Sequence, residues 1–115
     1  MKNHIMRLNP APMKSIRDGE KTIELRLYDE KRQKLAVGDT IKFVNTKNAT
    51  DTLYVIVEDL FVFDSFEELY KKLPLSECGY TKDNIDKASP RDMEYYYTRH
   101  QQSKYGVVGI KISLK

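Results

Sequence analysis

Apolar and polar residues alternate along several stretches of this chain, which is the pattern of half-buried β-strands. The clearest stretch covers residues 22–28, where Ile23, Leu25 and Leu27 share one face and polar side chains take the other. Residues 1–8 are expected to form a short strand or an ordered arm. The strand predicted over residues 52–63 is expected to bend or bulge near Glu58. Beyond residues 1–8 and 22–28, strands are predicted over residues 41–44, 52–63 and about 105–114.

Two short helices are predicted from their start and stop residues. The first covers residues 11–18, follows a proline-rich start and ends before Gly19, whose tolerance of a positive φ suits a chain reversal. Ser65 lies three residues before Glu68, which is the spacing of a capping box, and opens a second helix that Pro74 stops.

A third helix is expected to begin at Ser89-Pro90, with the serine as cap and the proline in the first helical position. One side of this helix would carry Met93, Tyr96, Tyr97 and His100, which fall at helical spacing. Such a stripe predicts packing against the strands. The alternative function of this segment is nucleic-acid contact, since tyrosines interleaved with basic residues such as Arg99 could stack on bases beside phosphate contacts.

The order of elements predicts an α+β fold built as a small, mostly antiparallel β-barrel with short flanking helices, because regular alternation of strand and helix is absent. The 115 residues fit one domain, covering residues 1–115. Hydrophobic residues make up 40% and charged residues 32%, as in ordinary globular proteins. No apolar run is long enough for a membrane span, and the N-terminus lacks the apolar stretch of a signal peptide, so a cytoplasmic location without a membrane partner is expected.

The net charge and the cysteine content limit the kinds of binding site that the chain can form. A net charge of +3 is only mildly basic, which favours a specific pocket over a broad cationic surface for nucleic acid. Cys78 is the only cysteine, so an intrachain disulfide and a cysteine-rich zinc site are excluded. His4 and His100 lie far apart and no cluster has metal-ligand spacing, so neither a metal nor a cofactor is predicted.

The segment from Gly19 to Arg26 concentrates charged side chains at the start of a strand. Glu24 and Arg26 are two residues apart and share a face, and Lys21 at the strand's entrance can reach the same space. In a binding site, Arg26 could present its planar fork to a phosphate or a base edge, while Glu24 accepts from an amino group. In a catalytic site, a desolvated Lys21 could act as base or nucleophile, with Glu24 relaying protons. The simplest alternative is an exposed Glu24–Arg26 ion pair, which contributes only about 0–1 kcal/mol.

The spacing Gly19-x-Lys21-x-x-Glu24-x-Arg26 resembles the G-x-K-x-x-E-x-R signature of the ASCH domain, a small β-barrel fold related to the RNA-binding PUA domains. The turn at Gly38, the tyrosine-rich segment and the closing strand agree, so the resemblance covers essentially the whole chain. It implies a cleft, lined by the signature, that binds RNA or a nucleoside- or nucleotide-like ligand. Together with the basic and aromatic residues nearby, the ligand contacts expected are Gly19, Lys21, Glu24, Arg26, Lys31, Arg32, Tyr97 and Arg99. For Lys31 and Arg32, a solvated turn would explain the same charges.

Some small bacterial ASCH proteins are amidohydrolases that deacetylate 4-acetylcytidine, which makes hydrolysis the alternative activity. Those enzymes use the signature lysine, a threonine three residues later and a glutamate from a later segment. Lys21 matches the lysine, whereas Glu24 occupies the threonine's position. The later glutamate could be any of Glu58, Glu67, Glu68 and Glu77. The departure at Glu24 favours ligand binding over hydrolysis.

Overall fold

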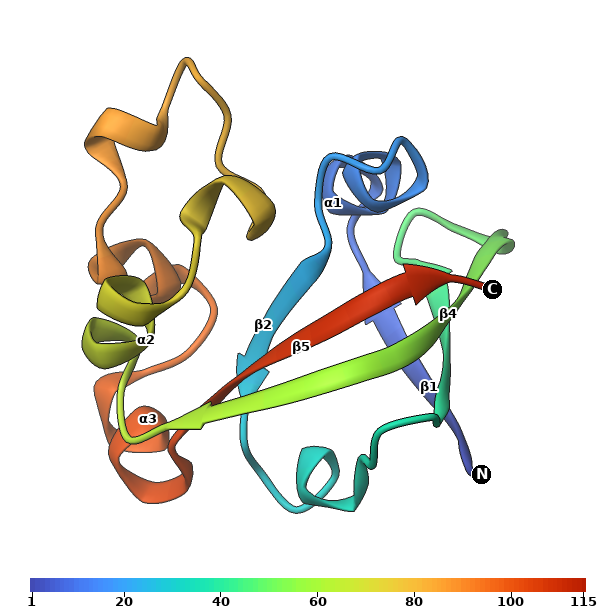
Figure 1. Cartoon of the computed structure of the whole chain (residues 1–115), viewed down its shortest axis with the longest axis horizontal. Helices are drawn as coiled ribbons and strands as arrows, with labels where there is room; N and C mark the ends of the chain where they lie inside the picture. The colour runs from blue at the N-terminus through green and yellow to red at the C-terminus, as the bar shows by residue number, and fades with distance from the viewer.

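One curved sheet of five strands forms the frame of the molecule (Figure 1), as seen in a computed structural model that describes residues 1–115. The strands lie in the order β1-β3-β4-β5-β2, and every neighbouring pair is antiparallel except β1 with β3, which is parallel. Their bounds are β1 Asn3–Leu8, β2 Ile23–Leu27, β3 Thr40–Asn45, β4 Asn48–Phe63 and β5 Val107–Leu114. The sheet curls into a half-barrel, which confirms the predicted α+β class and the mostly antiparallel pairing.

Short helices flank the sheet. The α-helices are α1 Pro10–Arg17, α2 Phe66–Lys72 and α3 Arg99–Tyr105, and the 3-10 turns are η1 Arg32–Lys34, η2 Leu75–Glu77, η3 Ile85–Lys87 and η4 Pro90–Tyr95. Ser65 caps α2, since its side chain accepts a hydrogen bond from the Glu68 backbone N–H, as predicted. Gly19 follows the end of α1 with φ +81°, so the predicted reversal into β2 is also confirmed.

Two hydrophobic clusters lie on opposite faces of the sheet. The inner cluster fills the half-barrel beneath α1 and is built around Phe43, while the outer cluster packs α2 and η4 on the other face around Phe66. Both phenylalanines are at most 1% exposed, and fully burying such a side chain contributes about 1.5–3 kcal/mol. Alternation along β5 separates the faces, with Val107 in the outer cluster and Val108 in the inner one. Figure 1 shows the layer from residue 66 to residue 105 to one side of β2, and α1 to the other.

The predicted third helix is wrong in its length and in its buried face. The turn η4 ends at Tyr95, and Thr98 starts the separate helix α3 with a capping box in which its side chain accepts from the Gln101 N–H while the Gln101 side chain accepts from the Thr98 N–H. The expected stripe is therefore broken: Met93 is buried, whereas Tyr96 is 59% exposed. The helical spacing of Met93, Tyr96, Tyr97 and His100 predicted one continuous helix, but the cap at Thr98 starts a new helix within that stretch.

Two strand boundaries also differ from the prediction. The connection between the strands predicted over residues 41–44 and 52–63 is shorter than expected, because β4 already begins at Asn48. The last strand begins at Val107 rather than residue 105, because Tyr105 ends α3 and Gly106 turns the chain with φ +71°. The predicted bulge is present, as the register of β4 against β5 shifts between Val57 and Asp59.

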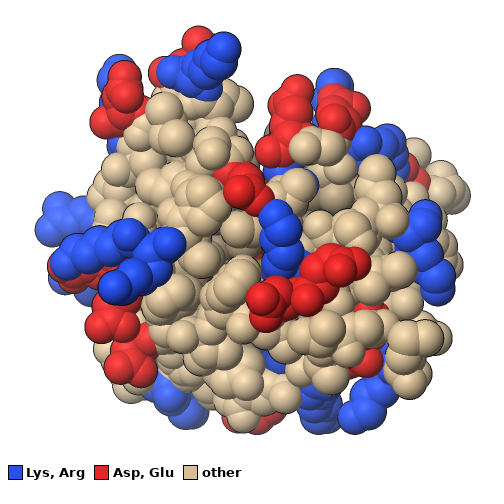
Figure 2. All heavy atoms as spheres, in the orientation of Figure 1, with Lys and Arg blue, Asp and Glu red and all other residues tan.

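Charges of both signs are interspersed over the face seen in Figure 2, without a continuous basic surface. None of the helices is long and apolar enough to cross a membrane. No group of three or more His, Cys, Asp or Glu side chains is placed to hold a metal ion.

Candidate functional site

Glu24 and Arg26 lie on the inner face of β2. They pair in the sheet with Ile110 and Val108, which belong to the inner hydrophobic cluster. Glu24 is only 4% exposed. The alternative of an exposed surface ion pair is therefore wrong, because this pair lies at the open side of the half-barrel and is shielded from solvent.

Glu24 is the centre of a buried charge cluster, which we call the signature cluster: Lys21, Glu24 and Arg26. Glu24 Oε1 lies 2.7 Å from Lys21 Nζ and Oε2 lies 2.6 Å from Arg26 Nε. Burial raises the pKa of Glu24, but the charges of Lys21 and Arg26 and their hydrogen bonds outweigh this effect and lower the pKa to about 2. Glu24 is thus ionised at neutral pH, and the cluster carries one net positive charge.

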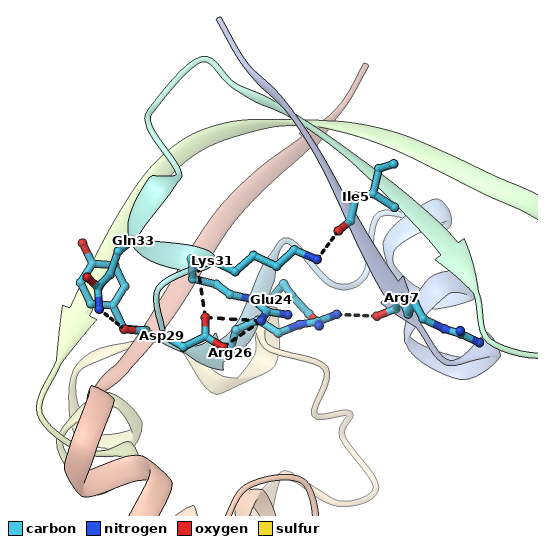
Figure 3. A network of polar contacts seen from close by, with 9 residues as sticks. Ile5, Arg7, Glu24, Arg26, Asp29, Lys31 and Gln33 are labelled. Carbon is cyan, nitrogen blue, oxygen red and sulfur yellow. Dashed lines mark hydrogen bonds and ion pairs between the residues drawn. The ribbon is translucent and has the colours of Figure 1, made fainter.

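Arg26 also reaches across the open side of the half-barrel, as Figure 3 shows. Its Nη2 donates to the Arg7 carbonyl at 2.8 Å, and Lys31 Nζ donates to the Ile5 carbonyl at 2.6 Å. Both carbonyls belong to β1, which is not paired with β2 in the sheet. Side chains from β2 and the following segment therefore bridge the two edge strands where backbone pairing is absent.

Lys21 is positioned by the end of α1 and by Gly79. The Lys21 N–H donates to the Ser15 carbonyl at 3.0 Å, which fixes the turn after α1. A Cβ atom at Gly79 would lie 3.5 Å from Lys21 Cδ and 3.7 Å from Nζ, and Gly79 has φ +110°. The Lys21 side chain thus packs against Gly79, whose backbone conformation other residues rarely adopt.

A cleft of about 510 Å³ lies over the signature cluster, between α1 with the end of β1 on one side and the layer of residues 70–97 on the other. Of the eight predicted contacts, four line it: Lys21, Glu24, Arg26 and Tyr97. The other four lie outside. Gly19 forms the turn before β2, and Lys31 belongs to the bridge between the edge strands. Arg32 pairs with Asp29 at 3.1 Å. Arg99 pairs with Glu94 at 2.8 Å, and its side chain is 71% exposed.

Tyrosines form the wall opposite α1. Tyr97 was predicted as a contact and Tyr95 and Tyr96 belong to the segment considered for base stacking, whereas Tyr70 and Tyr80 were not predicted. The Tyr80 hydroxyl donates to Asp92 Oδ2 at 2.6 Å and lies 2.7 Å from the Tyr70 hydroxyl. Burial and the bond to Asp92 raise the pKa of Tyr80, so its phenol stays protonated. Asp92 also accepts from the Ser89 N–H within the capping box that opens η4. The capping spacing is visible in the sequence, but the link to Tyr80 depends on the fold.

None of the four later glutamates considered for hydrolysis lines the cleft. Glu77 directly precedes Cys78, which lines the cleft, but its carboxylate accepts from Thr22 Oγ1 at 2.7 Å and from Lys111 Nζ at 2.5 Å. The only carboxylates on the cleft wall are those of Glu24 and Asp92. Cys78 also contacts the cleft, yet burial raises the pKa of its thiol to about 11, which makes it a poor nucleophile at neutral pH.

Comparison with known proteins gives one family and several solved structures. A family model described as ASCH domain matches residues 6–115. The crystal structure of the hypothetical protein PH0355 is 32% identical, with full coverage of both chains and a TM-score of 0.81. The solution NMR structure of protein PF0455 from Pyrococcus furiosus is 31% identical, covers 99% of this chain and 97% of its own, and has a TM-score of 0.73.

A more distant structure shares the fold. The crystal structure of a mutant of the ZmASCH protein from Zymomonas mobilis is 17% identical, with 98% of this chain and 70% of that chain covered and a TM-score of 0.68. A comparison with curated proteins gives no match.

Proposed function

This chain belongs to the ASCH domain family, and from that membership and the geometry of the cleft we propose that it binds RNA or a nucleotide-like ligand over Lys21, Glu24 and Arg26. The ASCH domain is a PUA-like domain, and the curved sheet has that fold. The observation that carries the proposal is the signature cluster itself: three charged side chains, each at most 11% exposed, face a cleft walled by tyrosines. Charged groups with a shifted pKa beside a cleft are typical of functional sites, which favours ligand recognition.

The free hydrogen-bond donors of the cluster support a ligand that carries oxygen acceptors. An ammonium group has three N–H donors, and only Glu24 is within pairing distance of Lys21 Nζ. Arg26 uses Nε for Glu24 and one N–H of Nη2 for the Arg7 carbonyl. Both cations therefore retain donors for a base carbonyl or a phosphate oxygen, while Glu24 holds them in place.

The four predicted contacts outside the cleft remain predictions for a ligand that extends beyond it. Lys31, Arg32 and Arg99 would then meet phosphates along an RNA strand, and Gly19 would act through the turn that positions Lys21.

We also infer that residues 1–115 form one domain, because the single sheet joins both hydrophobic clusters and the family match spans residues 6–115. A cytoplasmic location is proposed on the composition alone.

Replacement of Lys21 tests the proposal most directly. Lys21→Met keeps the apolar stem beside Gly79 and leaves Glu24 paired with Arg26, so a folded protein with one charge removed is expected. Binding of the four ribonucleosides and of short RNAs should weaken at least about 10-fold, since a lost charge-assisted hydrogen bond costs about 1.5–3 kcal/mol. Lys14→Met is the matched control, because Lys14 is a highly exposed lysine outside the cleft.

Equal binding by wild type and a correctly folded Lys21→Met variant would contradict the proposal. Near-ultraviolet circular dichroism and the unfolding midpoint report whether the variant folds. Salt dependence then separates two ligand types: affinity that falls steeply with salt indicates phosphate contacts, whereas a nucleoside pocket is much less sensitive.

The alternative function is an amidohydrolase that converts 4-acetylcytidine and water into cytidine and acetate. The observation that favours it is that Lys21 and the carboxylate of Asp92 line the same cleft. Glu24, with its pKa lowered to about 2, is poorly matched to proton transfer at neutral pH, so binding is favoured over hydrolysis. Incubation with 4-acetylcytidine tests this function, and turnover no faster than that of Lys21→Met would exclude it for this substrate.

A further inference from the structure

Two tyrosines at the mouth of the cleft are exposed to an extent that packing does not explain. Tyr95 is 87% exposed and Tyr96 is 59% exposed, although both line the cleft. Neither belongs to the hydrophobic clusters on the two sheet faces. Neighbouring exposed aromatic rings beside a cleft are typical of interaction surfaces rather than of core packing.

These rings continue an aromatic row that begins in the outer core. Phe66 is buried, and its ring is stacked on that of Tyr97 with centroids 6.2 Å apart and planes at 15°. The ring of Tyr97 lies 6.4 Å from that of Tyr96, and Tyr96 meets Tyr95 edge to face at 5.1 Å and 84°. The exposed fraction rises along this row, so the Phe66 end is held in the core and the Tyr95 end is accessible to solvent.

The backbone around the row is fixed at both ends. Ser89 and Asp92 form a capping box at the start of η4, and Thr98 and Gln101 form another at the start of α3. Tyr95 is the last residue of η4 and Thr98 caps α3, so residues 95–97 lie between the two capping boxes, which limits the motion of the chain that carries the rings. An edge-to-face pair leaves flat ring surfaces unoccupied, and a planar group can stack on them.

We propose that Tyr95 and Tyr96 form a stacking platform for an unpaired RNA base next to the nucleotide held in the cleft. This inference rests on the proposed function and specifies its ligand class as single-stranded RNA of at least two nucleotides. Aromatic side chains that stack on bases give affinity with little sequence preference, because every base has a flat face. The platform thus supplies affinity for the strand, and the signature cluster contacts the nucleotide in the cleft.

The experiment compares each ribonucleoside with the matching homopentanucleotide, with Kd measured by titration calorimetry. Wild type should bind the pentanucleotide more tightly. The Tyr95→Ala/Tyr96→Ala variant should lose at least about 5-fold more affinity for the pentanucleotide than for the nucleoside, given what stacking contributes per base. Tyr95→Phe/Tyr96→Phe should retain the wild-type affinity, because stacking needs the ring and not the hydroxyl. Tyr54→Ala is the control, since Tyr54 is 48% exposed but lies on β4 outside the cleft.

The outcomes separate the platform from the function on which it rests. If nucleosides bind in a Lys21-dependent way but the alanine variant binds pentanucleotides as well as wild type does, the platform is excluded and the cleft stands. Equal losses for nucleosides and pentanucleotides would also overturn it, since the rings would then contact the ligand inside the cleft. Failure of wild type to bind either probe would overturn both proposals.

Discussion

The Glu24 carboxylate and the Arg26 guanidinium pair at 2.6 Å on the inner face of β2, at the open side of the half-barrel. Through the same guanidinium, Arg26 bonds the Arg7 carbonyl on β1. One ion pair therefore belongs to two structures at once: the bridge between the edge strands and the base of the cleft. Changes to these residues should affect both stability and ligand binding, so experiments must separate the two.

Arg26→Met should destabilise the protein by about 3–5 kcal/mol, which is the range for breaking a buried ion pair. The substitution removes the Glu24 pair and the bond to the Arg7 carbonyl together, while Lys21 remains near the carboxylate. Urea denaturation measures the free energy of unfolding. Arg17→Met is the matched control: Arg17 pairs with Asp51 but is 44% exposed, so its loss should cost no more than about 1 kcal/mol. Similar losses in both variants would contradict the structural role of Arg26.

Glu24→Gln should change the pH dependence of stability. The folded-state pKa of Glu24, about 2, lies below the ordinary value of 4.5, so the carboxylate contributes stability that is fully present above about pH 5 and is lost as pH falls toward 2. The advantage of wild type over Glu24→Gln should therefore be greatest at neutral pH, at about 3 kcal/mol, and shrink in acid. Unfolding free energies measured between pH 2 and pH 7 test this, and a difference that does not vary with pH would refute it.

Asp39 does not obscure this comparison, although its pKa is also lowered to about 2, chiefly by the hydrogen bond from His4. Asp39 is present in both proteins, so its titration cancels in the difference between them.

The strands could be predicted from sequence because their signals are local. Alternation along β2 correctly separates the residues of its two faces, and the Ser65 cap and the Gly19 reversal follow from single residues. The long helix was wrong because one local signal, the Thr98 cap, overrides the spacing of apolar residues on which that prediction relied. Parallel pairing of β1 with β3 depends on contacts between residues more than 30 positions apart and has no local signal.

In the candidate site too, the features with a local sequence signal could be predicted, and those that depend on distant contacts could not. The spacing of Lys21, Glu24 and Arg26 indicated that their side chains could meet, since residues two apart on a strand share a face. That Glu24 would be buried could not be read from the sequence, because burial depends on the curl of the whole sheet. Tyr80 and Asp92 were missed for a related reason: their hydrogen bond links an irregular loop to a later turn.

Gly106→Ala should destabilise the protein by at least about 3 kcal/mol. Gly106 has φ +71° and ψ −171°, a conformation that is essentially restricted to glycine, and an added Cβ would lie 2.9 Å from the Phe63 carbonyl oxygen. Gly19→Ala is the control for positive φ alone, because no atom lies within 4 Å of its added Cβ, and it should cost about 1 kcal/mol. Thermal and urea unfolding give both values. Equal effects would show that the contact with Phe63 adds nothing.

Cys78 should react slowly with thiol reagents in the folded protein. It is 6% exposed, and burial raises the pKa of its thiol to about 11, so little thiolate exists at pH 8. The rate of reaction with Ellman's reagent should be at least about 100-fold lower than in concentrated urea, and it should still rise as the pH increases from 8 to 10. Rapid labelling of the native protein would show that the outer cluster opens at this wall of the cleft.

Tyr80→Phe should loosen the wall of the cleft that faces α1. The hydroxyl donates to Asp92 and contacts the Tyr70 hydroxyl, so its removal leaves both partners without their bond and should cost about 1–2 kcal/mol. Tyr54→Phe is the control, since Tyr54 is 48% exposed and lies on β4 outside the cleft. Hydrogen exchange should accelerate over residues 75–92 in Tyr80→Phe and not in the control. If the wall holds the ligand against Lys21, nucleoside affinity should fall in the same variant. Faster exchange with unchanged affinity would show that ligand contact depends on the signature cluster and not on this wall.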